Sequence, residues 1–325
     1  MPVLEIRDLE VSFGPIRILR GVSFDLEAGQ TLGVVGESGC GKSMTGFAIM
    51  GMLQAPGRIS AGSIKLDGRE LVGLREREYR DIRGDQIALV MQDPFTSLNP
   101  MMRVGDQIAE AFVLHQNLNW RTAREKAVEM LGKVGVPSPA SSARKYPHQM
   151  SGGQRQRVVI AIAFACKPKV LIADEPTTAL DVTLQAQILR LLRQLQDEEK
   201  TAVMLISHDI GAIASVSQRI AVFYAGKIVE VGPAGQVLGE PAMPYTKALL
   251  NALPDPSKDR LAAIKGQPPD FTALGTDCAF RPRCPFAIEK CLEEPGLIQI
   301  GADHRSACWR AQEVMAEAVP VPAQS

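Results

Sequence analysis

The sequence predicts an α/β fold: a domain built on a largely parallel sheet, followed by a small, loop-rich C-terminal module. Up to about residue 240, short apolar runs alternate with longer helical patterns, as in proteins whose parallel strands are connected by helices. Beyond that point, 11 of the 22 prolines fall in about a quarter of the chain, and dense proline disfavours long helices and central strands. We therefore place the boundary between Gly232 and Pro244.

Composition indicates an ordinary globular protein and excludes several functions. Of the 325 residues, 46% are hydrophobic, and 36 Lys plus Arg balance 36 Asp plus Glu. Without net charge there is no global field to attract nucleic acid, so we expect no nucleic-acid partner. The chain start lacks the pattern of a signal peptide, which predicts a cytoplasmic protein. The longest apolar stretch, Val158–Cys166, is far shorter than the roughly 20 residues that cross a bilayer, so any transport pore would belong to other chains.

Several short apolar runs end in a polar residue or a glycine turn. These runs are Leu32–Val35, Ile87–Met91, Val170–Ala173 and Val203–Ile206. As parallel strands they would bring the groups that follow them to one edge of the sheet, where ligands of open α/β sheets bind. No internal repeat is apparent, which disfavours a solenoid or two fused copies.

A phosphate-binding loop of the form G-x-x-x-x-G-K-[ST] follows the first of these runs. Its residues are Gly36, Glu37, Ser38, Gly39, Cys40, Gly41, Lys42 and Ser43. Glycines let backbone N–H groups turn toward phosphate oxygens at a helix N-terminus, Lys42 offers a point charge, and Ser43 offers a hydroxyl to Mg²⁺. The alternative is a glycine-rich turn with a chance lysine.

Two adjacent carboxylates, Asp174 and Glu175, end the third apolar run, where they would be costly without a cation or water to engage. Asp174 is suited to hold Mg²⁺, and Glu175, facing the other way, to act as general base on the attacking water. Taken alone, such a pair is usually the start of a loop. The phosphate loop upstream favours the catalytic interpretation.

A second possible anion site precedes the apolar helix pattern RQRVVIAIAFA. Ser151 is suited to cap this helix, and Gly152 and Gly153 leave its first N–H groups open to an anion, with Gln154 beside them. A simply capped helix is the alternative.

Together these motifs resemble the ATP-binding cassette (ABC) ATPase family over residues 3–240. Met150–Gln154 is similar to the LSGGQ signature of that family, with Met in place of Leu, a volume-conserving change. The resemblance implies a P-loop ABC ATPase domain over 1–240, with a helical subdomain at about 93–165. It also implies that two such domains pair head to tail, each ATP lying between one phosphate loop and the partner's signature.

The resemblance assigns roles to four further residues. Phe13 resembles the aromatic that stacks on adenine, and Gln92 the glutamine that senses Mg²⁺ and the membrane subunit. Asp181 resembles the D-loop aspartate, and His208 the switch histidine that contacts the γ-phosphate. Singly, each has an alternative interpretation as a core, capping, turn or strand-end residue. The implied catalytic residues are thus Glu175, His208 and Gln92, and the implied Mg²⁺ ligands are Ser43, Gln92 and Asp174.

Two segments resemble the import group for dipeptides, oligopeptides and nickel: Gln92–Pro100 and Pro244–Leu250. The resemblance implies two permease subunits, an external binding protein and a paralogous ATPase, with this chain peripheral on the cytoplasmic face of the inner membrane. Peptide is the favoured cargo, while nickel, glutathione and sugar remain alternatives. A non-transport ABC ATPase is disfavoured because no long coiled coil or second cassette is visible.

Four cysteines crowd the C-terminal extension, residues 241–312, with the spacing C-x5-C-x6-C-x16-C. They are Cys278, Cys284, Cys291 and Cys308. Thiolates select zinc or iron–sulfur, and the short knuckles of structural zinc sites are absent. The resemblance adds that such extensions can carry a cluster, so we predict [4Fe–4S], with zinc and free thiols as alternatives. Intact Lys42, Glu175 and His208 argue against a metal-storage module, and we expect a mobile tail at 313–325.

Overall fold

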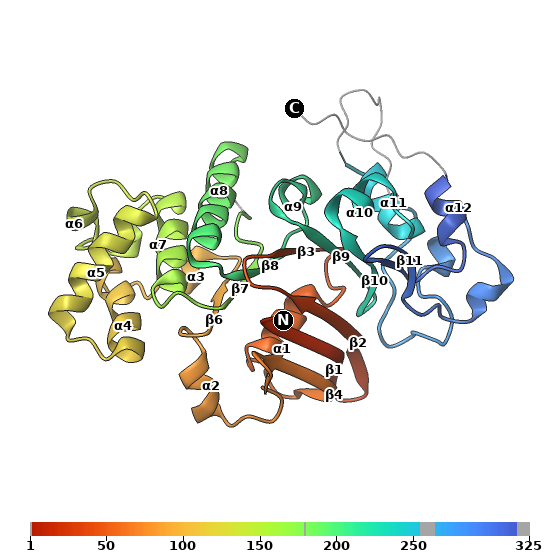
Figure 1. Ribbon diagram of the computed structural model, residues 1–325, viewed down its shortest axis with the longest axis horizontal. Coiled ribbons are helices and arrows are strands. Elements are labelled where there is room, and N and C mark those ends of the chain that lie inside the picture. The colour runs from red at the N-terminus through yellow and green to blue at the C-terminus, as the bar shows by residue number, and fades with distance from the viewer. Residues whose placement is uncertain (1, 179, 254–263, 317–325) are drawn as a thin grey trace. The chain divides into compact units, whose positions relative to one another are not determined.

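The computed structural model describes residues 2–178, 180–253 and 264–316 (Figure 1). The chain divides into two compact units. One comprises Met1–Leu4, Asp25–Thr31 and Lys65–Ile206. The other comprises Glu5–Phe24, Leu32–Ile64 and Ser207–Ser325. These are the first and the second unit, respectively.

The first unit is built on three parallel strands with β7 in the middle. They are β6 (Ile87–Val90), β7 (Val170–Asp174) and β8 (Ala202–Ile206). Val90 lies opposite Ala173, and Asp174 opposite Ile206. Every residue of β7 and β8 is buried, because strands of a parallel sheet are covered on both faces and read as continuous apolar runs. The three predicted strands are confirmed to within one residue at each end.

Helices make up most of the remainder of this unit. Its elements are β5 (Arg69–Glu70), α2 (Glu76–Ile82), α3 (Pro94–Ser97), α4 (Val104–Gln116), α5 (Trp120–Lys133), α6 (Pro139–Ser142), the 3-10 turn η1 (Pro147–Gln149), α7 (Gly152–Phe164) and α8 (Val182–Glu199). Helices α3 to α7 lie between β6 and β7 in the chain, over the stretch where the sequence predicts a helical subdomain. Within this group α4 packs on α5 and α7.

The second unit holds a mixed sheet and an antiparallel one. In the first, β3 (Thr31–Val35) runs parallel to β9 (Arg219–Tyr224), followed by the antiparallel strands β10 (Lys227–Pro233), β12 (His304–Ser306) and β11 (Ile298–Gly301). The other contains β2 (Ile16–Leu26), β1 (Leu4–Phe13) and β4 (Gly57–Leu66), in that order, apart from a few residues at the strand ends that belong to the first unit. Its helices and 3-10 turns are α1 (Lys42–Ile49), α9 (Ile210–Val216), α10 (Ala234–Gly239), α11 (Pro244–Asn251), η2 (Arg281–Arg283), η3 (Glu289–Leu292) and α12 (Ala311–Ala316).

The C-terminal extension shares a sheet with strands that precede it in the chain. Ser306 of β12 lies opposite Glu230 of β10. The carboxylate of Glu230 is fully buried and accepts hydrogen bonds from the backbone N–H of Ala242 at 2.7 Å and of Met243 at 3.1 Å. It also lies 2.8 Å from Nε2 of His304. The sheet thus continues across the predicted boundary near residue 240, and the boundary itself stays a prediction.

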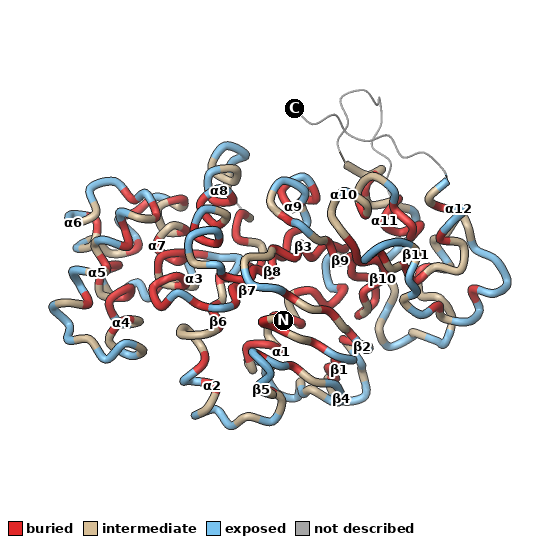
Figure 2. Tube along the Cα trace, viewed as in Figure 1, coloured by how far each residue is buried: buried red, intermediate tan, exposed pale blue. Residues whose placement is uncertain are grey.

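Burial is most complete in the central strands (Figure 2): in the second unit β9 and β10 are buried except at Arg219, Lys227 and Pro233. No helix in the described ranges is long and apolar enough to cross a membrane. The predicted tail begins inside α12, which extends to Ala316. Residues 317–325 lie outside the described residues, so mobility of the tail stays a prediction.

Candidate nucleotide site and cysteine pocket

The predicted nucleotide residues divide between the two units. The second unit contains Phe13, the phosphate loop and His208. The first contains Gln92, the signature residues Ser151 to Gln154, Asp174, Glu175 and Asp181.

The phosphate loop leaves the buried end of β3 and leads into α1. Three of its glycines have positive φ: Gly36 at 150°, Gly39 at 79° and Gly41 at 109°. A Cβ on Gly36 would lie 2.3 Å from the carbonyl oxygen of Phe223, and one on Gly41 would lie 2.7 Å from Leu19 Cδ2. Glycine is therefore required at both positions by conformation and by space.

Lys42 is buried and turned back onto its own loop. Its Nζ donates to the carbonyl oxygens of Gly36 at 2.8 Å and Glu37 at 2.9 Å. Cys40 is also buried, and that burial raises the pKa of its thiol. The lysine is thus held over the loop, where its charge can meet a phosphate.

His208 and Phe13 are the other two predicted residues of this unit. The backbone N–H of Ser207 donates to the carbonyl of Val34 at 3.2 Å, one residue before β3 ends. His208, the next residue, is exposed. Phe13 ends β1 half-buried, and its ring lies so close to Gly57 that a Cβ there would be 2.5 Å from Cζ. The ring atoms Cζ and Cε1 therefore pack against Gly57, and adenine stacking by Phe13 stays a prediction.

In the first unit the structure brings together two of the predicted catalytic residues. Gln92 Nε2 donates to Oε2 of Glu175 at 3.0 Å, and the hydroxyl of Thr178 donates to the same oxygen at 2.8 Å. Glu175 has a φ of 48°, a left-handed conformation that non-glycine residues seldom adopt and that is found more often at functional sites. Asp174, just before it, is buried at the end of β7.

The signature residues form the cap of α7. The backbone N–H of Gln154 donates to Ser151 Oγ at 3.3 Å, and that of Ser151 to Gln154 Oε1 at 3.2 Å, which is a capping box. A Cβ on Gly152 would meet nothing within 4 Å, so this side of the helix start is open. Asp181 caps α8 by accepting from the N–H of Leu184 at 2.9 Å.

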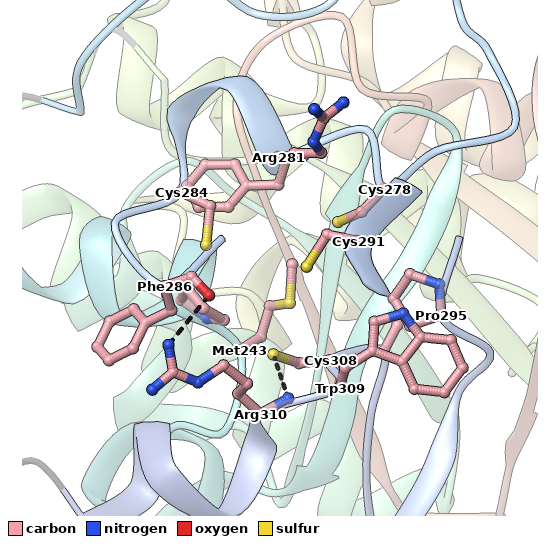
Figure 3. A pocket seen from close by; sticks show the side chains of 13 residues that line it. Met243, Cys278, Arg281, Cys284, Phe286, Cys291, Pro295, Cys308, Trp309 and Arg310 are labelled. Carbon is pink, nitrogen blue, oxygen red and sulfur yellow. Dashed lines mark hydrogen bonds between the residues drawn. The ribbon is translucent and has the colours of Figure 1, made fainter. Parts of the chain in front are cut away.

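The four clustered cysteines line a single pocket in the second unit (Figure 3). Their thiols are turned toward the same space, beside the side chain of Met243. Burial raises the pKa of Cys278 and of Cys308 to about 11. No group of three or more His, Cys, Asp or Glu side chains in the described part of the chain is arranged to hold a metal ion.

Backbone N–H groups point at the sulfur atoms of this pocket. The N–H of Arg310 donates to Cys308 Sγ at 3.4 Å. Backbone hydrogen bonds from Phe280 to Cys278 and from Phe286 to Cys284 partly offset the effect of burial on the pKa of each thiol. Such bonds stabilise thiolates and are among the features that tune iron–sulfur ligands. The pocket thus gathers four thiols, and a metal site there stays a prediction.

Two features of these sites were missed at the level of sequence. The hydroxyl of Thr178 donates a hydrogen bond to the carboxylate of Glu175. The only sequence signal for this contact is the position of Thr178, three residues after a carboxylate at a strand end. Arg283 lies between two of the cysteines and forms an ion pair with Glu37 of the phosphate loop. No local pattern connects these two residues.

Comparison with known proteins agrees with this geometry. A family model described as "ABC transporter" matches residues 19–178, and one described as "Oligopeptide/dipeptide transporter, C-terminal region" matches residues 229–291. The dipeptide transport ATP-binding protein DppD of Escherichia coli (strain K12) is 46% identical over 315 residues, which cover 95% of this chain and 96% of that protein. The oligopeptide transport ATP-binding protein OppD of Salmonella typhimurium (strain LT2) is 46% identical over 317 residues, covering 96% and 94%.

Among solved structures, a dimeric post-hydrolysis state of the ATP-binding cassette MJ0796 bound to ADP and Pi matches with a TM-score of 0.64 and 26% identity, over 71% of this chain and 98% of that one. The protein is thus an ATPase of the ABC class. More particularly, it belongs to the family of ATP-binding subunits of ABC transporters. The predicted family and the predicted α/β fold are confirmed.

Proposed function

We propose that this chain is the ATP-hydrolysing motor of an importer of dipeptides or oligopeptides. The observation that carries the hydrolytic role is the placement of Glu175, whose carboxylate is held by Gln92 and Thr178 at the end of a buried strand. The cargo class is supported by the C-terminal family match and by relatives that are named as dipeptide and oligopeptide transport proteins.

ATP is bound in this proposal by residues 36–43, with Phe13 against the adenine. The loop N–H groups and Lys42 contact the phosphates, as expected for a glycine-rich turn at a helix N-terminus. Ser43, Gln92 and Asp174 would hold Mg²⁺, which would supply positive charge to offset the charge on the phosphates. Thr178 and Gln92 fix the direction of the Glu175 carboxylate.

Hydrolysis then needs a water and a general base. Glu175 takes the proton of the attacking water, and His208 contacts the γ-phosphate. Ser151, Gly152, Gly153 and Gln154 present the start of α7 to the ATP of a second ATPase subunit, with Asp181 beside that junction. The open side of Gly152 supports this role, because an anion can approach the first N–H groups there.

The partners follow from the same proposal. The second ATPase subunit is a paralogue paired head to tail, and two integral-membrane permeases form the pore. An external binding protein delivers the peptide, and this chain is peripheral on the cytoplasmic face of the inner membrane.

Co-purification and transport test this assignment. The tagged chain, co-expressed with candidate permeases and the paralogous ATPase, should purify as a complex with them. In proteoliposomes, a dipeptide or oligopeptide with its binding protein should raise ATP hydrolysis and accumulate inside. Stimulation by a nickel chelate, glutathione or a sugar, without a response to any peptide, would contradict the peptide assignment.

The cysteine pocket forms a second part of the proposal: Cys278, Cys284, Cys291 and Cys308 hold a [4Fe–4S] cluster. Support comes from the four thiols around one pocket and from the N–H groups that point at their sulfur atoms. Four cysteine thiolates are the ligand set that a [4Fe–4S] cluster would require. Bound there, it crosslinks a proline-rich segment that has little core of its own.

Metal analysis tests the cluster. Protein purified without oxygen should be brown, absorb near 400 nm and contain about four iron and four sulfide per chain, as expected for this type of cluster. A colourless preparation with about one zinc and no iron would contradict the proposal.

A further inference from the structure

An arginine of the cysteine-bearing segment is paired with the phosphate loop. Arg283 Nη1 donates to Oε2 of Glu37 at 2.7 Å, and Nη2 donates to Oε1 at 2.8 Å. The arginine side chain is only 5% exposed and that of Glu37 is 21% exposed. Both residues belong to the second unit. A bidentate pair with so little solvent access fixes the relative position of its partners more firmly than a surface ion pair.

Arg283 is held rigidly on the side of the cysteines. It ends η2, the turn between Cys278 and Cys284, and its Nε donates to the carbonyl of Lys265 at 2.9 Å. Its Nη1 also reaches the hydroxyl of Tyr224 at 3.3 Å. The N–H of Cys284, the next residue, donates to the carbonyl of Arg281 at 3.2 Å. A change in the path of the chain at Cys284 would therefore displace the guanidinium.

Glu37 is held just as firmly on the side of the loop. Its backbone N–H donates to the hydroxyl of Tyr245 at 2.8 Å. Its carbonyl accepts from Lys42 Nζ at 2.9 Å. The ring of Tyr245 packs on that of Phe280, with centroids 5.4 Å apart, and Phe280 is two residues from Cys278. Glu37 thus connects the phosphate-binding lysine to the cysteine-bearing segment by two routes, one ionic and one aromatic.

We propose that Arg283 is a positioning residue for the phosphate loop. Through the Arg283–Glu37 ion pair, a disordered cysteine pocket would lower the affinity of the loop for ATP. The inference rests on the proposed binding of ATP by this loop. Glu37 is the second residue of the loop, and its main chain provides one of the two carbonyls that hold Lys42. Without the ion pair, the loop and Lys42 become ordered only when ATP binds. The entropy lost in ordering them then lowers the affinity for ATP.

Nucleotide binding to the full-length chain tests the positioning role. Arg283→Gln should weaken equilibrium ATP binding about tenfold, equivalent to about 1.4 kcal/mol. The matched control is Arg281→Gln in the same turn, because the partner of Arg281 among the described residues is the half-exposed Asp277 at 3.2 Å. We expect this control to bind ATP within about twofold of wild type, as is usual for an exposed pair. Equal affinities of the two variants would overturn the positioning role.

A double-mutant cycle shows whether the effect passes through Glu37. Glu37→Gln should weaken ATP binding by a similar factor, and the double variant should be no weaker than either single one, because both remove the same pair. Arg283→Lys, which keeps the charge but loses the fork, should fall between wild type and Arg283→Gln. Additive effects of the two single changes would show that Arg283 acts elsewhere.

A variant in the cysteine pocket tests whether a change there alters ATP binding by the phosphate loop. Cys284→Ser should weaken ATP binding in the wild-type background but cause no further loss in Arg283→Gln. Hydrogen exchange should show lower protection of residues 36–43 in both variants and normal protection in Arg281→Gln. If Cys284→Ser lowers ATP affinity by the same factor in the wild-type and Arg283→Gln backgrounds, the pocket does not act on the loop through Arg283. Iron and zinc content, measured on the same samples, tests the cluster independently, and wild-type ATP binding and turnover test the motor role.

Discussion

Replacement of Glu175 by glutamine should stop most ATP turnover and leave ATP binding intact. Glu175 Oε2 accepts hydrogen bonds from Gln92 at 3.0 Å and from Thr178 at 2.8 Å. A glutamine side chain can keep an oxygen at this place, so it retains shape and both bonds but loses the charge that accepts a proton. General-base catalysis typically contributes about 10²–10⁴-fold, equivalent to about 2.7–5.4 kcal/mol in the barrier. We expect kcat to decrease by a factor within that range.

Thr178→Val provides the comparison that isolates the base from its support. The change keeps the shape of the side chain and removes one hydrogen bond to the carboxylate, which has a net value of about 1 kcal/mol. Turnover should therefore fall only about fivefold. A much larger loss of turnover in Glu175→Gln than in Thr178→Val would show that catalysis depends on the carboxylate itself more than on its orientation.

Phosphate release at saturating ATP, measured on the assembled transporter, gives both values. Size-exclusion chromatography with ATP should show that Glu175→Gln accumulates a closed dimer of ATPase subunits. Turnover of Glu175→Gln within about tenfold of wild type would refute the assignment of Glu175 as the base. A Thr178→Val variant as inactive as Glu175→Gln would instead make positioning the main contribution.

Three further outcomes are expected. Lys42→Ala should weaken ATP binding as well as turnover, because the charge meets the phosphates in the ground state too; equilibrium binding checks this. The isolated chain should hydrolyse ATP slowly at dilute concentration and faster with permeases and paralogue, because each signature completes a partner's site; equal rates would contradict the shared site. Glu230→Ala should lower the unfolding free energy by about 3–5 kcal/mol, because His304 and two backbone N–H groups lose a buried partner; calorimetry should show a midpoint roughly 6–20 °C lower.

Features with a local physical cause could be predicted from the sequence. Leu32–Val35 and Val170–Ala173 were placed to within a residue, because fully buried parallel strands consist of apolar residues without alternation. The cap of α7 at Ser151 follows from the preference for a hydroxyl at a helix start, reinforced by Gln154 three residues later. These patterns lie within a few residues, so they need no knowledge of the tertiary fold.

The supports of the candidate site were not predictable in the same way. Arg283 and Glu37 are separated by 246 positions, and neither an arginine before a cysteine nor a glutamate in a phosphate loop indicates a partner. The four cysteines can be recognised as a group by their spacing, but nothing in that spacing connects them with the loop. A pairing of charges across such a distance depends on the packing of the whole unit.

The burial of Glu230 explains how the cysteine-bearing segment acquires a fixed position. The segment has short elements and many prolines, so it cannot build a core of its own. Its strand β12 instead extends the sheet from β10, and Glu230 holds His304 and the N–H groups at the start of the extension in place. Because β9, the neighbour of β10, runs beside β3 and β3 leads into the phosphate loop, one continuous sheet orders both partners of the Arg283–Glu37 pair. Arg283 can therefore act on the loop from a segment that would be unstructured without that sheet.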